Sequence, residues 1–490
     1  MAKSVLLGIF MARLKAMSKI IGRKRELDLL KSVGESEVPV FLAVYGRRRV
    51  GKTFLIKQAF GNQFDFYLTG MSNVGLSQQL ANFHAALVKY DPLSNGKEPA
   101  PDWFSAFQQL TVLLESSRRA KKIVFLDELP WLDTAQSNFI SALEHFWNSW
   151  ASVRDDIKLI VCGSAAGWMI NKLIHNRGGL YNRVTHRIKL EPFTLKESEE
   201  FLKYKSGIFD KYQIVQLYMV FGGIPFYLEQ VDPRESAAQN INRLCFEKNG
   251  LLRAEFDSLY KSLFDKAEKH ISVIETLSKK ARGLTRGELI KEAKLSTGGG
   301  VTRVLKELEE SNFIRKYVSY GKKEQNSLYQ LTDFYSLFYL KFIKKTSILD
   351  ENSWINGLDN PEQRAWSGYA FEQVCLAHIR EIKQALGISG VQTATSSWVK
   401  MGAGPGVQID LVIDRRDHVI NICEMKFSIN NFTINKKYAE ELRNKVGVFR
   451  EETKTRKAIF LTMITTFGLH KNSYSTSLIQ NELAMDVLFA

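Results

Sequence analysis

Residues 46–53 read Gly46-Arg47-Arg48-Arg49-Val50-Gly51-Lys52-Thr53. An apolar stretch, 40–45, precedes this loop, and a stretch with helical spacing, 54–60, follows it. A strand, a glycine-bounded loop and a helix N-terminus in this order form the phosphate-binding P-loop. The glycines Gly46 and Gly51 let backbone N–H groups approach a polyphosphate, while the helix end adds partial positive charge. We therefore expect Lys52 to reach the terminal phosphates and the Thr53 hydroxyl to ligate Mg²⁺.

A second apolar stretch, 121–126, ends in two acids, Asp127 and Glu128. Many buried strands end in an acid, but beside a P-loop this pattern is typical of the Walker B element. Asp127 is then expected to hold the Mg²⁺ through water, and Glu128 to polarise the attacking water as the catalytic base.

Two further polar residues are candidates for the same site. Ser164 follows the next apolar stretch, 158–162, where its hydroxyl either senses the terminal phosphate or merely turns the chain. Arg183 is a candidate for neutralising transition-state charge, as arginines do in cis or from a neighbouring subunit. A surface salt bridge is the alternative for Arg183, and Arg177 competes with it for the role.

Segments 20–27, 127–131 and 223–225, together with the P-loop, resemble archaeal-type ATPases of the STAND branch, which is related to AAA+ proteins. The resemblance extends from about residue 18 to 490 and implies ATP and Mg²⁺ as cofactors. It implies that Ile21, Gly22 and Arg23 lie near the adenine or ribose, and that Pro225 touches the nucleotide from a helical lid. For Gly22 and Pro225, a simple turn is the alternative.

Length and pattern predict an α/β protein of several domains. Apolar strands alternate with helical patterns over residues 18–205, which predicts a parallel sheet with strands Val40–Tyr45, Phe64–Thr69, Ile123–Leu126, Lys158–Cys162 and Arg187–Leu190. The remaining parts are predicted to be a helical lid (206–266) interrupted at 222–225, a winged helix-turn-helix (267–345), a linker (346–366) and a second α/β domain (367–490).

Charge and cysteine content limit the environment and partners. The net charge of +16 and a pI near 9.4 suit a polyanion, with DNA as the leading partner, although a generally basic protein is the alternative. The four cysteines form no C-x-x-C pair, which suits a reducing, cytoplasmic location. No apolar run reaches the roughly 18–20 residues that cross a bilayer, so no membrane partner is expected. A weak apolar run at 5–12 suggests that translation begins at Met17.

The predicted winged helix is strongly basic. Helical patterns at 268–281 and 285–293 are followed by a turn and N-cap at 295–297 and a hairpin joined by residues 321–323. Between Lys279 and Lys323 there are twelve lysines and arginines against five glutamates. This excess favours a phosphate-binding face with Arg303 and Lys306 as candidates, and intramolecular packing is the alternative.

The C-terminal domain carries a separate polar pattern. Stretches 407–414 and 419–426 read as two strands joined by a turn, and pairing symmetric about residue 417 sets Asp410 opposite Glu424. Lys426 shares the face of Glu424 because strand residues two apart do so. Facing carboxylates call for a cation, so Mg²⁺ is the expected occupant, with a third ligand from Glu372 on an upstream helix and Lys426 orienting or deprotonating a water.

This D-x₁₃-E-x-K pattern with an upstream glutamate resembles the PD-(D/E)xK nuclease superfamily, although Ile409 stands where the proline of the motif's name would be. A surface ion pair on an edge strand is the alternative for Glu424 and Lys426. Tyr438 and Lys445 on the following helix face either phosphate or solvent.

The sequence therefore predicts an ATP-hydrolysing module coupled through a winged helix to a Mg²⁺-dependent, DNA-binding nuclease domain. One alternative is an ATP-driven switch whose C-terminal domain binds DNA or protein without cutting. Another is a signalling scaffold that forms a homo-oligomer on binding ATP.

Overall fold

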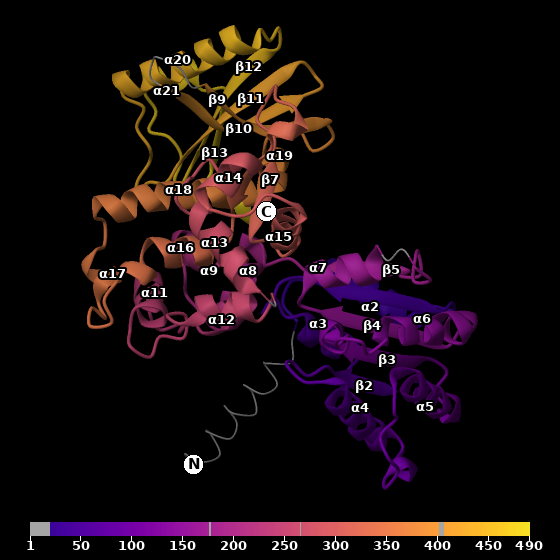
Figure 1. The fold of residues 1–490 in the computed structure, drawn as a ribbon. Helices are drawn as coiled ribbons and strands as arrows, with labels where there is room; N and C mark the ends of the chain where they lie inside the picture. Colours follow the sequence, from indigo (N-terminus) through magenta and orange to yellow (C-terminus); the bar gives the residue numbers. More distant parts are fainter. Residues whose placement is uncertain (1–19, 176–177, 265, 401–405) are drawn as a thin grey trace. The chain divides into compact units, whose positions relative to one another are not determined.

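The computed structural model describes residues 20–175, 178–264, 266–400 and 406–490, so the predictions for Met17 and Arg177 lie outside the described residues. The chain forms two compact units, the first ending at Glu191 and the second beginning at Pro192 (Figure 1). The break therefore falls before the predicted boundary at 205, because the helix that follows residue 192 packs with the second unit.

The first unit is built on a five-stranded parallel sheet in the order β2-β3-β4-β1-β5. Its strands are β1 (Val40–Tyr45), β2 (Phe66–Thr69), β3 (Lys122–Asp127), β4 (Ile157–Gly163) and β5 (His186–Lys189), which confirms the five predicted strands to within two residues at each end. Because every pair of neighbouring strands is parallel, the chain crosses back between successive strands, so all carboxyl ends meet at one edge. The P-loop follows β1, Asp127 is the last residue of β3 and Ser164 follows β4, so all three lie at that edge.

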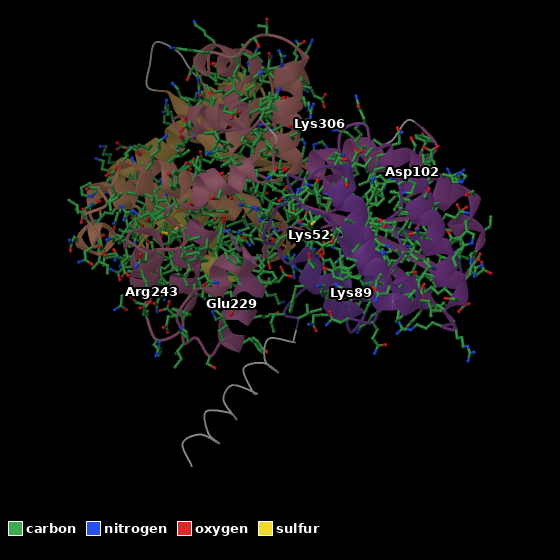
Figure 2. The ribbon with its side chains drawn as sticks, turned by 60° about the horizontal axis from the view of Figure 1, so that its bottom comes forward. Lys52, Lys89, Asp102, Glu229, Arg243 and Lys306 are labelled. Atoms are coloured by element: carbon green, nitrogen blue, oxygen red, sulfur yellow. The ribbon has the colours of Figure 1, made fainter. Side chains whose placement is uncertain are left out.

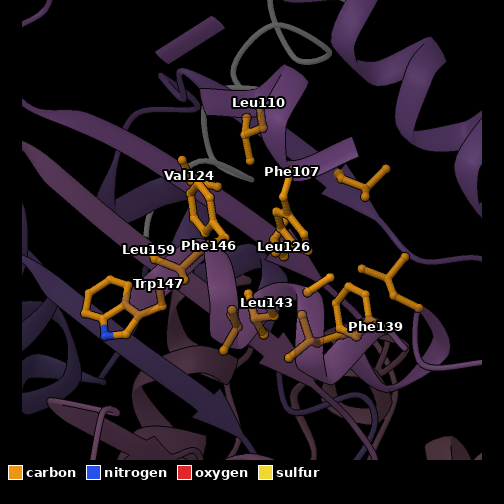
Figure 3. Packing of buried hydrophobic residues seen from close by; sticks show 14 of the residues in the cluster. Phe107, Leu110, Val124, Leu126, Phe139, Leu143, Phe146, Trp147 and Leu159 are labelled. Carbon is orange, nitrogen blue, oxygen red and sulfur yellow. The ribbon is translucent and has the colours of Figure 1, made fainter. Parts of the chain in front are cut away.

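Helices pack against this sheet and hold the ends of its strands in place. They are α2 (Lys24–Glu35), α3 (Lys52–Ala59), α4 (Leu76–Tyr90), α5 (Trp103–Ser116), α6 (Phe139–Ser149) and the short α7 (Ala166–Trp168). Figure 3 shows α5 and α6 packing Phe107, Phe139 and Phe146 over Val124 and Leu126 of β3. Alternate residues of β3 point to this face because strand side chains alternate, so its end is held firmly.

The second unit begins with the helices predicted as a lid. They are α8 (Leu195–Tyr204), α9 (Lys211–Phe221), α10 (Pro225–Glu229), α11 (Ala237–Cys245) and α12 (Glu255–Lys261). The predicted interruption at 222–225 is confirmed: Gly222, with φ of 61°, ends α9, and Pro225 opens α10, where its missing N–H costs nothing.

Three helices and a small antiparallel sheet follow. The helices are α13 (Ala267–Leu277), α14 (Arg286–Glu292) and α15 (Gly299–Glu310), and the sheet, in the order β6-β8-β7, comprises β6 (Leu284–Thr285), β7 (Ile314–Tyr317) and β8 (Leu328–Leu331). The predicted hairpin is confirmed, with Ile314 opposite Leu331. The predicted N-cap at 295–297 is wrong: Gly298 precedes α15, and no side chain caps this helix.

The segment predicted as a linker is largely ordered. After α16 (Phe334–Lys341), the segment contains α17 (Ser353–Asn356) and the first turn and a half of α18 (Pro361–Ala377). Trp354 and Trp366 are buried against Phe338 and Phe342. Packing among these aromatic rings outweighs the turn-forming composition, which misled the prediction.

The C-terminal region is a five-stranded mixed sheet in the order β13-β12-β11-β10-β9. Its strands are β9 (Thr393–Lys400), β10 (Val407–Arg415), β11 (Val419–Lys426), β12 (Ala458–Thr465) and β13 (Asn481–Ala484), and its helices are α19 (Ile379–Ala385), α20 (Lys436–Thr453) and α21 (Ser473–Leu478). Leu411 pairs with Cys423 and Asp414 with Ile420, so the predicted register symmetric about residue 417 is confirmed. In the described residues, no helix combines the length and apolarity that a membrane crossing would need.

Candidate functional site

The P-loop adopts a backbone that requires glycine at its two ends. Gly46 has φ of 147°, and a Cβ atom there would lie 2.3 Å from the carbonyl oxygen of Leu190. Gly51, with φ of 90°, is the N-cap of α3. Both conformations favour glycine, which is why the loop can curl tightly before the helix N-terminus.

Lys52 (labelled in Figure 2) is buried and folds back into the loop. Its ammonium donates hydrogen bonds to the carbonyl oxygens of Gly46 at 3.0 Å and Arg47 at 2.9 Å, and to the Ser164 hydroxyl at 3.0 Å. Three acceptors hold the charge at the place where a P-loop receives phosphates. On binding, phosphate oxygens would therefore replace these three acceptors of the Lys52 ammonium.

The two predicted magnesium ligands of the first unit lie together. The Thr53 hydroxyl donates to Asp127 at 2.9 Å, and Asp127 is almost fully buried. Burial raises the pKa of the Asp127 carboxyl, while the hydrogen bond from Thr53 opposes this shift. A hydroxyl and a buried carboxylate in contact are oxygen donors of the kind that Mg²⁺ prefers, so these residues fit the ion.

Ser164 connects the lysine to the candidate base. Its hydroxyl donates to Glu128 at 2.6 Å, and its backbone N–H donates to the other Glu128 oxygen at 3.1 Å. The same hydroxyl accepts the hydrogen bond from Lys52. These contacts place Ser164 between Lys52 and Glu128, and its role as a sensor of the terminal phosphate stays a prediction.

The predicted C-terminal residues form a second polar cluster around Glu424. The side chain of Glu424 is buried on β11, the central strand of its sheet, which excludes a surface ion pair on an edge strand. It pairs with Lys426 at 3.1 Å and Lys445 at 2.7 Å, and accepts a hydrogen bond from Tyr438 at 2.8 Å. Both interactions from α20 show that Tyr438 and Lys445 face this site rather than solvent.

Asp410 and Glu372 lie near this cluster, and both have a raised pKa. Burial, together with the charge of Asp410, raises the pKa of Glu372 to about 8. Burial also raises the pKa of Asp410, against a hydrogen bond from Gln408. Among the residues that the structure describes, however, no three His, Cys, Asp or Glu side chains are grouped closely enough to hold a metal ion. The predicted ligand set of Glu372, Asp410 and Glu424 is thus not assembled as a metal site, because ammonium groups occupy Glu424.

Comparison with known proteins bears on the first of these sites. Residues 20–231 match the family of ATPase domains found predominantly in Archaea. The match supports ATP binding and ATP hydrolysis, and it extends through the P-loop, Asp127, Glu128 and Ser164 to the end of α10.

Individual relatives are distant. An uncharacterized protein of Methanocaldococcus jannaschii is 26% identical over 375 residues, which cover 74% of this chain and 78% of that protein. The Walker-type ATPase of Pyrococcus abyssi is 15% identical with a TM-score of 0.48, over 66% of this chain and 96% of that structure. A STAND protein of Pyrococcus horikoshii with a tetratricopeptide repeat sensor is 15% identical with a TM-score of 0.31, over 76% of this chain and 52% of that structure.

The other residues predicted for the ATPase site are less closely connected to it. Arg23 is buried beside Gly22, and its guanidinium donates to the carbonyl oxygen of Glu191 at 2.6 Å. Glu191 directly follows Leu190, whose carbonyl oxygen lies against Gly46 of the P-loop. Arg183 is exposed, and no side-chain contact joins it to the P-loop in the described residues. Pro225 opens α10 in the second unit, and its contact with nucleotide stays a prediction.

Sequence reasoning missed one group of contacts. Tyr212 of α9 stacks on Phe427 at 5.2 Å and on Phe467 at 5.5 Å between ring centroids. Phe427 also packs against Phe371 at 5.5 Å. Phe427, directly after Lys426, and Phe371, directly before Glu372, were the signals visible in the sequence. Neither pattern predicts Tyr212 as their partner.

Proposed function

We propose that this protein is an ATP-hydrolysing switch whose nucleotide state controls a DNA-binding, nuclease-like C-terminal domain. The observation that carries this proposal is the contact between α9, which lies within the matched ATPase segment, and Phe427, which adjoins Lys426. A part of the matched segment thereby touches the residue next to Lys426 in the C-terminal polar cluster.

In the ATPase domain, Lys52, Thr53, Asp127 and Glu128 would bind ATP with Mg²⁺ and hydrolyse it. ATP supplies the phosphates that Lys52 binds in exchange for the carbonyl oxygens of the loop and Ser164. Thr53 and Asp127 would hold Mg²⁺, which neutralises phosphate charge. Loss of the lysine contact leaves Ser164 bonded to Glu128 alone, so the state of Glu128, as catalytic base, depends on whether Lys52 is engaged.

The aromatic stack supports transmission of this change. Tyr212 stacks on two rings, Phe427 and Phe467, and the first of these packs on Phe371 beside Glu372. Packed rings transmit displacement because interiors are close-packed and resist compression. A shift of α9 would therefore move the residues on both sides of the cluster, Lys426 and Glu372.

The proposed DNA contact rests on charge and on the fold of residues 267–331. Three helices followed by a hairpin support the proposal of a winged helix-turn-helix. Arg303 and Lys306 are exposed on α15, the third helix of this part. The hairpin end is engaged elsewhere, since the Tyr320 N–H donates to the Ser397 carbonyl at 2.7 Å and its ring packs on Phe449. We therefore assign DNA contact to α15 and the C-terminal region, and intramolecular packing to the wing.

Metal-dependent DNA cleavage is the second candidate for the C-terminal domain. The confirmed hairpin register and the burial of Glu424 beside Lys426 favour it, as in the PD-(D/E)xK pattern. The arrangement of side chains does not fit a metal, because Lys445 and Lys426 pair with Glu424. Binding without cutting is therefore the function that the geometry supports better.

One experiment separates these functions. Fluorescently labelled single-stranded DNA and plasmid are incubated with the protein, with and without ATP, in Mg²⁺ or Mn²⁺, and both binding and cleavage are followed. We expect an ATP-dependent change in DNA affinity that Tyr212→Ala abolishes and Tyr212→Phe, which keeps the stack, preserves. DNA affinity that ignores ATP in the parent protein would refute the proposed switch.

Cleavage in the same assay decides the second candidate. Products that disappear in Glu424→Ala but persist in Glu452→Ala, a change at an exposed glutamate of α20, would establish a nuclease. Cleavage that survives Glu424→Ala would come from another source and remove the nuclease assignment.

A further inference from the structure

A cavity of about 210 Å³ lies in the second unit, between the three-stranded sheet and the C-terminal α/β region. Its walls combine a guanidinium, phenol rings, carboxyl groups and an amide, contributed by Arg315, Tyr317, Tyr369, Glu372, Gln408 and Asp410. Two of these residues, Glu372 and Asp410, belong to the predicted nuclease motif, while Arg315 and Tyr317 come from β7. The cavity is therefore shared by two parts of the chain that the sequence presents as separate domains.

Arg315 is held in place by neutral partners. Its Nε donates to the side-chain oxygen of Gln330 at 2.8 Å, and its Nη2 donates to the same oxygen. The Gln330 amide in turn donates to the carbonyl oxygen of Ala281. Among the described residues no carboxylate forms an ion pair with Arg315. Gln330 therefore orients its guanidinium without neutralising the charge. An arginine kept in this way is suited to an anion from outside.

The wall that carries Arg315 is anchored to the opposite wall. Beyond β7, the Tyr320 N–H donates to the Ser397 carbonyl of β9, and Ser319 forms a strand-like bridge to the same residue. The ring of Tyr320 packs on Phe449 at 5.2 Å. Backbone contacts and a buried ring therefore set the distance between Arg315 and the carboxyl groups across the cavity.

We propose that this cavity receives one unstacked nucleotide of single-stranded DNA, with Arg315 contacting its phosphate. The guanidinium fork, which lies over the Tyr317 ring at 5.6 Å from its centroid, matches phosphate oxygens. The aromatic lining suits contact with a base, and carboxyl and amide groups suit the polar edge of a base. At about 30 Å³ for each water, the cavity equals roughly seven waters, which is far too small for a duplex. The inference rests on the proposed DNA-binding function and assigns that function its substrate form.

The test measures binding of a fluorescein-labelled single strand of about 16 nucleotides, the upper end of site sizes for single-strand binders, by anisotropy in EDTA. Full-length protein, Arg315→Ala, Arg315→Lys and the control Lys316→Ala are compared across a salt series. Lys316 neighbours Arg315 on β7 but is exposed. The substitution Lys316→Ala therefore removes one positive charge without changing the lining of the cavity. Thermal unfolding of each variant shows whether it is folded.

We expect Arg315→Ala to weaken binding about tenfold or more and to reduce the salt slope by about 0.7, the value of one phosphate contact on a single strand. Arg315→Lys should fall between, because it keeps the charge and loses the fork, and serves as the test if Arg315→Ala does not fold. Lys316→Ala should change affinity less than twofold, and a duplex of the same sequence should bind more weakly than the single strand.

Equal affinity of the Arg315 variants and Lys316→Ala for the single strand would overturn this inference and leave DNA binding intact. Preference for the duplex would also overturn it. Absence of DNA binding by the parent protein, in contrast, would refute the proposed function itself.

Discussion

Replacing Ser164 with alanine should separate ATP affinity from ATP turnover. The Ser164 hydroxyl accepts from Lys52 at 3.0 Å and donates to Glu128 at 2.6 Å. Hydrogen bonds to charged groups contribute about 1.5–3 kcal/mol each, and part of that is recovered when water replaces the hydroxyl. Because nucleotide must displace Ser164 from Lys52, removing this competitor should strengthen ATP binding by about 1–1.5 kcal/mol, which is roughly tenfold in Kd.

The same substitution should slow hydrolysis. Without the hydroxyl, Glu128 retains only the bond from the backbone N–H at 3.1 Å and loses its orientation as a base. A loss of about tenfold or more in kcat follows from misplacing a catalytic group. Calorimetric titration gives Kd and phosphate release gives kcat, with Ser164→Thr, which keeps a hydroxyl, as the control. If alanine left both quantities at parental values, Ser164 would be a turn residue. If alanine weakened ATP binding, the hydroxyl would contact nucleotide instead of competing with it.

Three further substitutions test the fold and its electrostatics. Gly46→Ala places a Cβ atom 2.3 Å from the Leu190 carbonyl oxygen, so we expect ATP binding to be lost and stability to fall by about 2 kcal/mol or more in urea unfolding; unchanged ATP affinity would contradict the loop geometry. Phe139→Ala removes a fully buried ring from the core of the first unit and should cost about 3–5 kcal/mol, whereas exposed Phe104→Ala on α5 should cost much less. Burial disfavours the charge on Asp156, but bonds from Arg154 and Lys122 outweigh it and lower the pKa to about 2. That lowered pKa stabilises the fold above about pH 4, and the contribution disappears as pH falls toward 2, so Asp156→Asn should be less stable than the parent at neutral pH and match it near pH 2 in thermal melts.

Local patterns were sufficient for the parts of the fold that depend on near neighbours. The P-loop strand, Val40–Tyr45, and the hairpin symmetric about residue 417 were both predicted from alternation and turn position. Register in a two-strand hairpin follows from its turn and its buried face, both of which are visible within about twenty residues. Thr53, Asp127 and Ser164 were likewise predictable, because parallel strands bring their carboxyl ends to one edge.

Contacts between distant segments could not be predicted in this way. Residues 346–366 have the composition of a linker, yet Trp354 and Trp366 bury themselves against Phe338. Whether a tryptophan is covered depends on a partner elsewhere in the chain, and composition does not name that partner. The same limit applies to Glu424. Its partner Lys445 lies on α20, and this ion pair takes the place of the metal that the strand pattern predicted.

Arg315 shows how this limit affects function. In the sequence it is one of twelve cations in a basic segment, and it was counted toward a phosphate-binding face. Strand alternation does separate it from Lys316, but only the packing of the hairpin on β9 determines what lies on each side. Lys316 is exposed to solvent, whereas Arg315 lines a cavity together with Asp410. A charge count predicts a polyanionic partner for both, whereas their environments assign them different tasks, and the comparison of Arg315→Ala with Lys316→Ala measures that difference directly.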